Sequence, residues 1–175
     1  MALTTLAALL LFLGEGKSGY DVRRLFQMTP IGLFSDSPGA IYPALARLEK
    51  AGLLAGEAQP SARRRRVFRR TAAGNEALDR WLRVPIDAET VEKRTHEIEL
   101  RYVLIAFHLG PAAAVQFLDE AAQNYERRIA DLEAFCAANQ AMGSISLDTL
   151  ELGIRLFRTR LSWCRDMQRK GEEGR

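Results

Sequence analysis

Residues 37–54, SPGAIYPALARLEKAGLL, constrain the fold more than any other stretch of this chain. Ser37 is a favourable helix N-cap, Pro38 suits the first helical position, and Gly52 supplies a stop signal. Apolar residues recur at helical spacing at Ile41, Leu45 and Leu48. The stretch therefore predicts a helix with one buried face that ends at Gly52.

A strand pattern follows this helix. Leu53 and Leu54 open a short apolar run, and Val67 and Phe68 resume one after a polar interruption. The interruption carries four successive arginines, Arg63, Arg64, Arg65 and Arg66. Helix, strand, basic tip and strand predict a winged helix-turn-helix, so we expect a mainly α fold with a small β-hairpin wing.

The same residues resemble the PadR family of bacterial transcriptional regulators. The resemblance rests on GAIYPALARLEKAGLL, with LTTLAALLLFLGEGKSGYDV before it and RRRRVFRRTAAGNEAL after it. Its most specific features are Gly-Tyr-Asp at 19–21, the IYPAL core, and a T-x-x-G helix start at Thr71 to Gly74. It covers roughly the first half of the chain, and it implies a winged DNA-binding domain over residues 1–85 followed by a helical domain over residues 86–175.

The segments before residue 37 complete the expected motif. Residues 3–13 predict a helix that is apolar nearly all round, and residues 20–27 predict a second helix capped by Ser18. A turn is expected over residues 29–36. The sequence GKS at 16–18 does not form a phosphate-binding loop, because Leu11 stands where the first glycine of that motif would be.

The resemblance implies that the helix of residues 37–52 enters the major groove of DNA, with its N-terminal residues nearest the bases. Ser37 would then bond a phosphate, Gly39 would allow close approach, and Tyr42 would reach a phosphate or a base edge. Arg47 and Lys50 would contact the DNA backbone. The alternatives are a cap at Ser37, helix packing at Gly39, a core position for Tyr42, and a solvated charged face for the two cations.

Charge is distributed unevenly along the chain. Up to Pro85 there are 13 Lys and Arg against 7 Asp and Glu, and beyond it there are 12 against 15. The four arginines at 63–66 repel one another, and DNA phosphates or a narrow minor groove would relieve that repulsion. A solvated charge run is the alternative. A basic half beside a mildly acidic half is typical of a nucleic-acid-binding module joined to a domain with another role.

Three helices are expected in the second half, over about residues 89–109, 112–140 and 147–169. The last two carry heptad-like apolar seams. For the third helix we interpret the seam as a dimerisation surface, made of Leu147, Leu150, Ile154, Phe157 and Leu161. An intramolecular bundle is the alternative.

Catalytic and metal-binding patterns are weak. His96 lies near Glu92 and Glu99 on one expected helix face, but a zinc site normally has more nitrogen or sulfur ligands. Cys136 and Cys164 lie in apolar stripes and are expected to be buried free thiols. We therefore expect no enzyme, no metal and no cofactor.

The resemblance also suggests a small-molecule effector, for which Tyr102, Phe107 and Trp163 could line a pocket, although such aromatics are more often core. We expect a repressor that binds a palindromic operator as a homodimer on double-stranded DNA. The alternative is a winged-helix protein-interaction module with a nonspecific basic surface. The apolar run of residues 6–13 is too short to span a membrane and lacks the features of a signal peptide, so the cytoplasm is the expected location.

Overall fold

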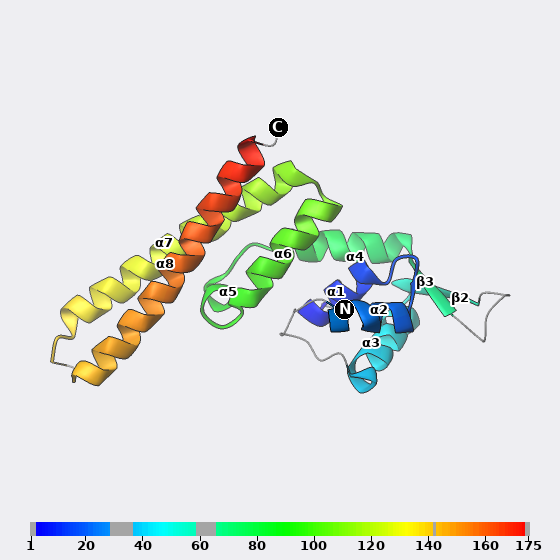
Figure 1. Ribbon diagram of the computed structural model, residues 1–175, viewed down its shortest axis with the longest axis horizontal. Coiled ribbons are helices and arrows are strands. Elements are labelled where there is room, and N and C mark those ends of the chain that lie inside the picture. Colours follow the sequence, from blue (N-terminus) through cyan, green and yellow to red (C-terminus); the bar gives the residue numbers. More distant parts are fainter. Residues whose placement is uncertain (1–2, 29–36, 59–65, 142, 174–175) are drawn as a thin grey trace. The chain divides into compact units, whose positions relative to one another are not determined.

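The computed structural model describes residues 3–28, 37–58, 66–141 and 143–173. The chain divides into two compact units, Met1–Val84 and Pro85–Arg175. It is mostly helical, with one small three-stranded antiparallel sheet, and this confirms the expected fold class (Figure 1). Each unit is described below by itself.

The first unit contains four helices and the sheet within its described residues. In chain order these elements are α1 (Thr5–Leu13), β1 (Lys17–Ser18), α2 (Gly19–Met28), α3 (Pro38–Lys50), β2 (Leu54–Ala58), β3 (Arg66–Arg70) and α4 (Ala72–Leu82). α1 packs against α3 and α4, and α2 packs against α3. The core holds the apolar residues expected from the helical spacing of α3, namely Ile41, Leu45 and Leu48, together with Leu9, Leu10, Leu11, Val22, Leu54 and Leu78.

The sheet has the order β1-β3-β2, with both pairs antiparallel. β2 and β3 form the expected hairpin, in which Gly56 lies opposite Phe68 and Ala58 lies opposite Arg66. Strand β1 was not predicted, because its two residues, Lys17 and Ser18, carry no apolar alternation. It is added to β3 by backbone pairing of Ser18 with Val67 and of Lys17 with Phe68.

Side-chain caps begin the helices of this unit where the sequence predicts them. The Ser37 hydroxyl accepts from the Ala40 amide, and the Ser18 and Asp21 side chains each accept from the other residue's amide. Thr71 begins α4 by accepting from the Gly74 amide at 3.0 Å, and its hydroxyl donates to the Gly52 carbonyl at 2.6 Å. The T-x-x-G pattern therefore joins α4 to the end of α3.

The second unit contains four helices within its described residues: α5 (Ala88–Lys93), α6 (Thr95–His108), α7 (Pro111–Ala138) and α8 (Ser144–Glu173). The expectation of one continuous helix over residues 89–109 was wrong, because the chain leaves helical geometry at Arg94 (φ −125°, ψ 34°). The Arg94 side chain turns back to donate to Thr90 Oγ1 at 2.9 Å. Asp87 caps α5, and hydrogen bonds from Thr90 lower the pKa of the Asp87 carboxyl.

Helices α7 and α8 form a long antiparallel hairpin (Figure 1). Ion pairs join the two helices between Arg158 and Glu133 and between Arg165 and Glu126. Residues further along α8 therefore pair with residues earlier on α7, as antiparallel helices require. The rings of Tyr125 and Phe157 meet between the two helices at a centroid distance of 6.0 Å. The α8 seam expected to pair subunits thus faces α7 at Phe157, and Ile154 on the same seam is buried.

Candidate nucleic-acid interface

Helix α3 has one buried face and one exposed face. The exposed residues are Ser37, Pro38, Gly39, Tyr42, Pro43, Ala46, Arg47 and Lys50. None of them is acidic, and they include every residue of this helix that the sequence analysis proposed as a DNA contact. A polyanion approaching this face would meet small, aromatic and basic side chains.

The N-terminal end of α3 is open. Ser37 and Gly39 are exposed, and a Cβ added at Gly39 would have only Ser37 Oγ, at 4.0 Å, near it. Pro38 begins the helix without an amide hydrogen, and the amide of Ala40 is occupied by the Ser37 hydroxyl at 3.3 Å. The space around Gly39 is therefore open, and the Ser37 hydroxyl serves as the helix cap.

Tyr42 is partly exposed at 44% and is not a core residue. Its ring lies against Gly19, the first residue of α2: a Cβ at Gly19 would come within 2.6 Å of Tyr42 Cε1 and 3.0 Å of Cδ1. Gly19 therefore creates the space in which the ring lies. The resemblance includes Gly19 as part of a turn, but its contact with Tyr42 could not be foreseen from the sequence.

Arg47 and Lys50 lie in the last turn of α3, both exposed. Cations at this end stabilise the helix by interacting with its C-terminal carbonyls. Their exposure is compatible with the expected contact to a phosphate backbone, and also with the alternative of a solvated face.

The three described arginines of β3 each lie near a glutamate. Arg66 Nη2 is 2.5 Å from Glu49 Oε1, and Arg69 Nε is 3.6 Å from Glu57 Oε2. Arg69 and Arg70 are therefore both paired.

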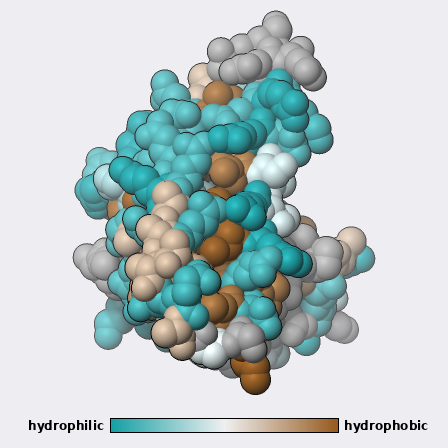
Figure 2. Space-filling view, turned by 90° about the vertical axis from the view of Figure 1, so that its left-hand side faces the viewer, coloured by the Kyte–Doolittle hydropathy of each residue, from teal (hydrophilic) through white to brown (hydrophobic). Residues whose placement is uncertain are grey.

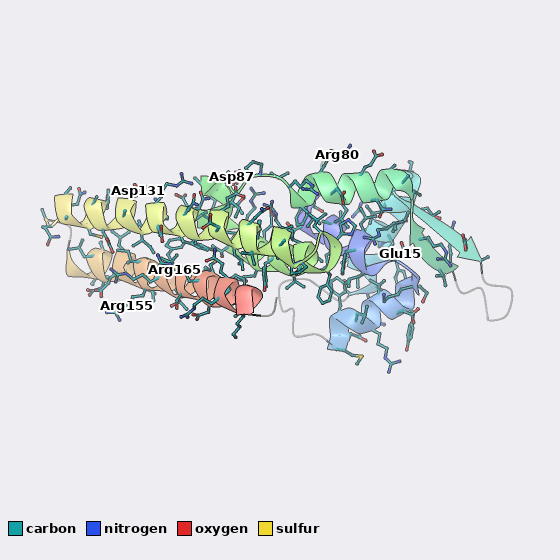
Figure 3. All side chains as sticks on the ribbon, turned by 90° about the horizontal axis from the view of Figure 1, so that it is seen from above. Glu15, Arg80, Asp87, Asp131, Arg155 and Arg165 are labelled. Atoms are coloured by element: carbon teal, nitrogen blue, oxygen red, sulfur yellow. The ribbon has the colours of Figure 1, made fainter. Side chains whose placement is uncertain are left out.

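Of Arg69 and Arg70, Arg70 is the more enclosed, with a side chain that is 16% exposed. Its Nε is 3.5 Å from Glu15 Oε2, and its guanidinium lies 5.9 Å from the centre of the Phe12 ring. The same carboxylate of Glu15, labelled in Figure 3, accepts from the Arg70 amide at 2.7 Å. Arg70 therefore stabilises the first unit, whereas Arg63, Arg64 and Arg65 lie outside the described residues.

The other candidate sites are in the second unit. Tyr102 and Trp163 pack edge to face at a centroid distance of 5.4 Å, joining α6 to α8, whereas Phe107 is largely exposed. Five helical positions separate Tyr102 from Phe107, which places them about 140° apart around α6. The structure thus brings together two of the three aromatics proposed for an effector pocket.

The residues considered for a metal site have other partners. Glu92 pairs with Arg128 at 3.2 Å, and Glu99 pairs with Arg160 at 3.5 Å. Within the described ranges, no cluster of three His, Cys, Asp or Glu side chains is suited to a metal ion.

Residues 9–80 match the model of the Transcriptional regulator PadR-like family. Over these residues the chain is similar to the PadR-like family. Members of this family are transcription regulators and not enzymes. The match spans the chain from α1 to α4, and so it includes the candidate interface on α3.

Solved structures of transcriptional regulators align with most of this chain at low identity. Bacillus subtilis PadR in complex with operator DNA is 18% identical, with 96% of this chain and 99% of that chain covered and a TM-score of 0.40. The same regulator in complex with p-coumaric acid is 20% identical, with 97% and 99% covered and a TM-score of 0.42. The Vibrio cholerae virulence activator AphA is 19% identical, with 98% and 100% covered and a TM-score of 0.38. No curated protein sequence matches this chain.

None of the helices in the described part of the chain has the length and apolar character that a membrane crossing demands.

Proposed function

We propose that this chain is a PadR-like transcriptional regulator that binds double-stranded DNA in a sequence-specific manner through the exposed face of α3. The observation that carries the proposal is the open N-terminal end of that helix, where Gly39 leaves room and Tyr42 projects from a position set by Gly19. In winged helix-turn-helix proteins this end of the helix meets base edges in the major groove. Arg47 and Lys50 follow on the same exposed face and would bind phosphates.

The arginine-rich stretch between β2 and β3 supplies the second part of the proposed interface. Arg63, Arg64 and Arg65 stand between the two strands in the sequence, so they belong to the connection that a winged protein places on the DNA backbone or in the minor groove. Replacing all three by alanine should reduce the log-log slope of affinity against salt by about 0.9 for each phosphate that the variant no longer binds. An unchanged slope would remove these arginines from the interface.

Fluorescence anisotropy tests the proposal directly. The purified chain is titrated into labelled DNA from upstream of its own gene, with a scrambled duplex of equal length beside it, across a salt series. Binding that survives raised salt only on the upstream duplex supports a sequence-specific regulator. Equal binding to both duplexes that disappears with salt contradicts it, because nonspecific binding depends on phosphate charge alone.

The regulator acts as a homodimer in this proposal. Helix α8 keeps an apolar stripe exposed, with Leu152 and Leu156 at 57% and 51% exposure and Ile145 one heptad before Leu152. Phe135 of α7 is also exposed, and the register of the ion pairs across the hairpin places it level with Leu156. Exposed apolar atoms among hydrophilic ones are visible in Figure 2.

This stripe lies on the opposite side of α8 from the seam of Leu147, Leu150, Ile154, Phe157 and Leu161, about 160° away at 100° per residue. A second subunit packed on the stripe would therefore leave the seam against α7. A two-fold symmetric pair would present two α3 helices to a palindromic operator.

Repression and its release are the finer parts of the proposal. A dimer bound at a promoter in the bacterial cytoplasm would exclude the transcription machinery, which makes it a repressor.

A small-molecule effector that entered beside Tyr102 and Trp163 would disturb their edge-to-face packing. In a Trp81→Phe variant, Trp163 is the single tryptophan, and its fluorescence should change when an aromatic acid binds at a concentration that also releases DNA. Release without a change in fluorescence would exclude this site.

A winged-helix module that binds an acidic protein is the second candidate function, and the basic charge of the first half of the chain favours it as well. The salt series separates the two functions, because an acidic protein partner gives no preference between the two duplexes.

A further inference from the structure

Glu49 is the acidic residue of α3, the helix that would face DNA. A carboxylate on such a surface repels phosphates, so its place there requires another explanation. Its Oε1 accepts two hydrogen bonds from the β2–β3 hairpin, one from the Gly56 amide at 3.0 Å and one from Arg66 Nη2 at 2.5 Å. A single oxygen therefore joins α3 to both strands.

Gly56 of the hairpin leaves the space that this carboxylate occupies. A Cβ at Gly56 would lie 2.7 Å from Glu49 Oε1 and 2.3 Å from Arg66 Nε, so any other residue there would displace the pair. Arg66 reaches the site because strand alternation places it on the same face of β3 as the buried Phe68. Glu49, Gly56 and Arg66 thus form one contact, which we call the α3–hairpin clamp.

The clamp differs from the neighbouring ion pair of the same hairpin. The Glu49 side chain is 24% exposed against 65% for Glu57, whereas Arg66 and Arg69 are similarly exposed at 56% and 60%. Arg69 Nε lies 3.6 Å from Glu57 Oε2. An exposed, loosely spaced pair contributes little to position, because solvent screens it and both side chains move. The clamp combines a charge-assisted hydrogen bond from Arg66 with a hydrogen bond from the Gly56 amide. This geometry restricts the position of the hairpin on α3 more than the Arg69–Glu57 pair does.

We propose that Glu49 is a positioning residue for DNA binding: it holds the β2–β3 hairpin against α3 and directs Arg66 away from phosphate. The inference rests on the proposed function. The sequence alone places Arg66 among the expected DNA contacts; in this proposal its charge is satisfied by Glu49, and the contacts to phosphate come from Arg63, Arg64 and Arg65. Strands β2 and β3 held in this way need no ordering at Gly56 and Arg66 when DNA binds.

Two chemically identical substitutions test the clamp by the sign of their effects. Glu57→Gln removes a negative charge from the exposed pair, so affinity for the operator should rise by about twofold. Glu49→Gln removes the same charge, yet affinity should fall roughly tenfold because the hydrogen bond that positions the hairpin is weakened. Tighter binding by the Glu49→Gln variant would overturn the proposal.

The salt dependence of Arg66→Gln gives a second test. Its affinity should fall while its log-log salt slope stays unchanged, whereas the slope for Arg47→Gln should decrease by about 0.9, the value for one bound phosphate. A slope for Arg66→Gln that falls as much as that of Arg47→Gln would show that Arg66 binds phosphate, and this outcome would also overturn the proposal. Circular dichroism melting of each variant establishes that it is folded before its affinity is compared.

Amide exchange tests the clamp without DNA, so failure of the clamp and failure of the proposed function can be told apart. The Gly56 amide should exchange slowly in the wild-type chain and in Glu49→Gln, whose amide oxygen can still accept, and fast in Glu49→Ala. Equal exchange in all three would refute the clamp. If the wild-type chain shows no preference for the operator, the proposed function fails while this measurement still decides whether the clamp exists.

Discussion

Gly19 and Gly39 lie at the N-terminal ends of α2 and α3, and the space around them is very different. A methyl group at Gly19 would meet the Tyr42 ring at 2.6 Å, whereas at Gly39 the nearest atom is Ser37 Oγ at 4.0 Å. Both glycines have ordinary helical surroundings in the sequence, and neither has a positive φ angle. Their roles therefore follow from tertiary contacts and not from backbone conformation.

Substituting alanine at the two positions should change stability in opposite directions. Gly19→Ala should lower the free energy of unfolding by about 1–3 kcal/mol, because the Tyr42 ring must move out of a packed position. Gly39→Ala should raise it by up to about 1 kcal/mol, because alanine has the higher helix propensity. Urea unfolding of the two variants measures both effects. Equal stability of Gly19→Ala and the wild-type chain would show that the ring adjusts without cost.

Sequence separation explains which residue contacts could be predicted from the sequence. The caps at Ser37 and Thr71 were predicted because each acts on an amide three residues away. The contact of Glu49 with Arg66 spans 17 residues of sequence and depends on how α3 meets the hairpin. The available signal was the lone acid on a basic helix, which indicated that Glu49 was unusual but did not identify its partner.

At the scale of elements, periodicity predicted α3, the hairpin and the two long helices, because each has an apolar face that repeats over several turns or alternates along a strand. It failed at β1, where pairing comes from the backbone of two residues, and at Arg94, where apolar periodicity continues across the break. Periodicity also located the α8 seam but could not distinguish packing within the chain from packing between subunits.

Burial between α7 and α8 predicts a loss of stability at high pH. Cys164 and Tyr125 are both buried, and burial raises the pKa of the Cys164 thiol from 9.0 to about 12 and also raises the pKa of the Tyr125 hydroxyl. The fold favours the protonated thiol and hydroxyl. Their contribution to the free energy of unfolding is therefore complete below the pKa values of the unfolded chain and is lost as pH rises from about 9.

The free energy of unfolding should therefore fall above pH 9, and the thiol contributes as much as about 1.4 kcal/mol for each pH unit. Cys164→Ala removes the thiol and should flatten the dependence between about pH 9 and 10, whereas Tyr125→Phe should act mainly above about pH 10. Urea midpoints measured from about pH 7.5 to 10.5 test this expectation. A Cys164→Ala variant with the pH dependence of the wild-type chain would contradict the assignment.

At the scale of the whole molecule, the chain combines a basic half with a mildly acidic half, and the two compact units divide it at nearly the same residue. Many acidic residues of the second unit pair with arginines, as Glu126 does with Arg165, labelled in Figure 3. The unit therefore offers no comparable excess of basic charge, and its exposed apolar stripe on α8 is the feature suited to binding another protein surface.

The stripe predicts how subunit association and DNA affinity are linked. The double substitution Leu152→Asp with Leu156→Asp places charges at exposed positions, so the chain should still fold but sediment as a monomer. Affinity for the full operator should fall by at least roughly 100-fold, because the second α3 is no longer held at a high effective concentration. Affinity for a single half-site should be unchanged, since α3 is untouched.

Val103→Asp is the matched control, because Val103 is an exposed apolar residue of the same unit that lies on α6. This variant should remain a dimer and bind the full operator as the wild-type chain does. A dimeric Leu152→Asp/Leu156→Asp variant would exclude the α8 stripe as the subunit interface. A monomeric variant with undiminished affinity for the full operator would instead show that one subunit is sufficient for recognition. A palindromic operator would then no longer be expected.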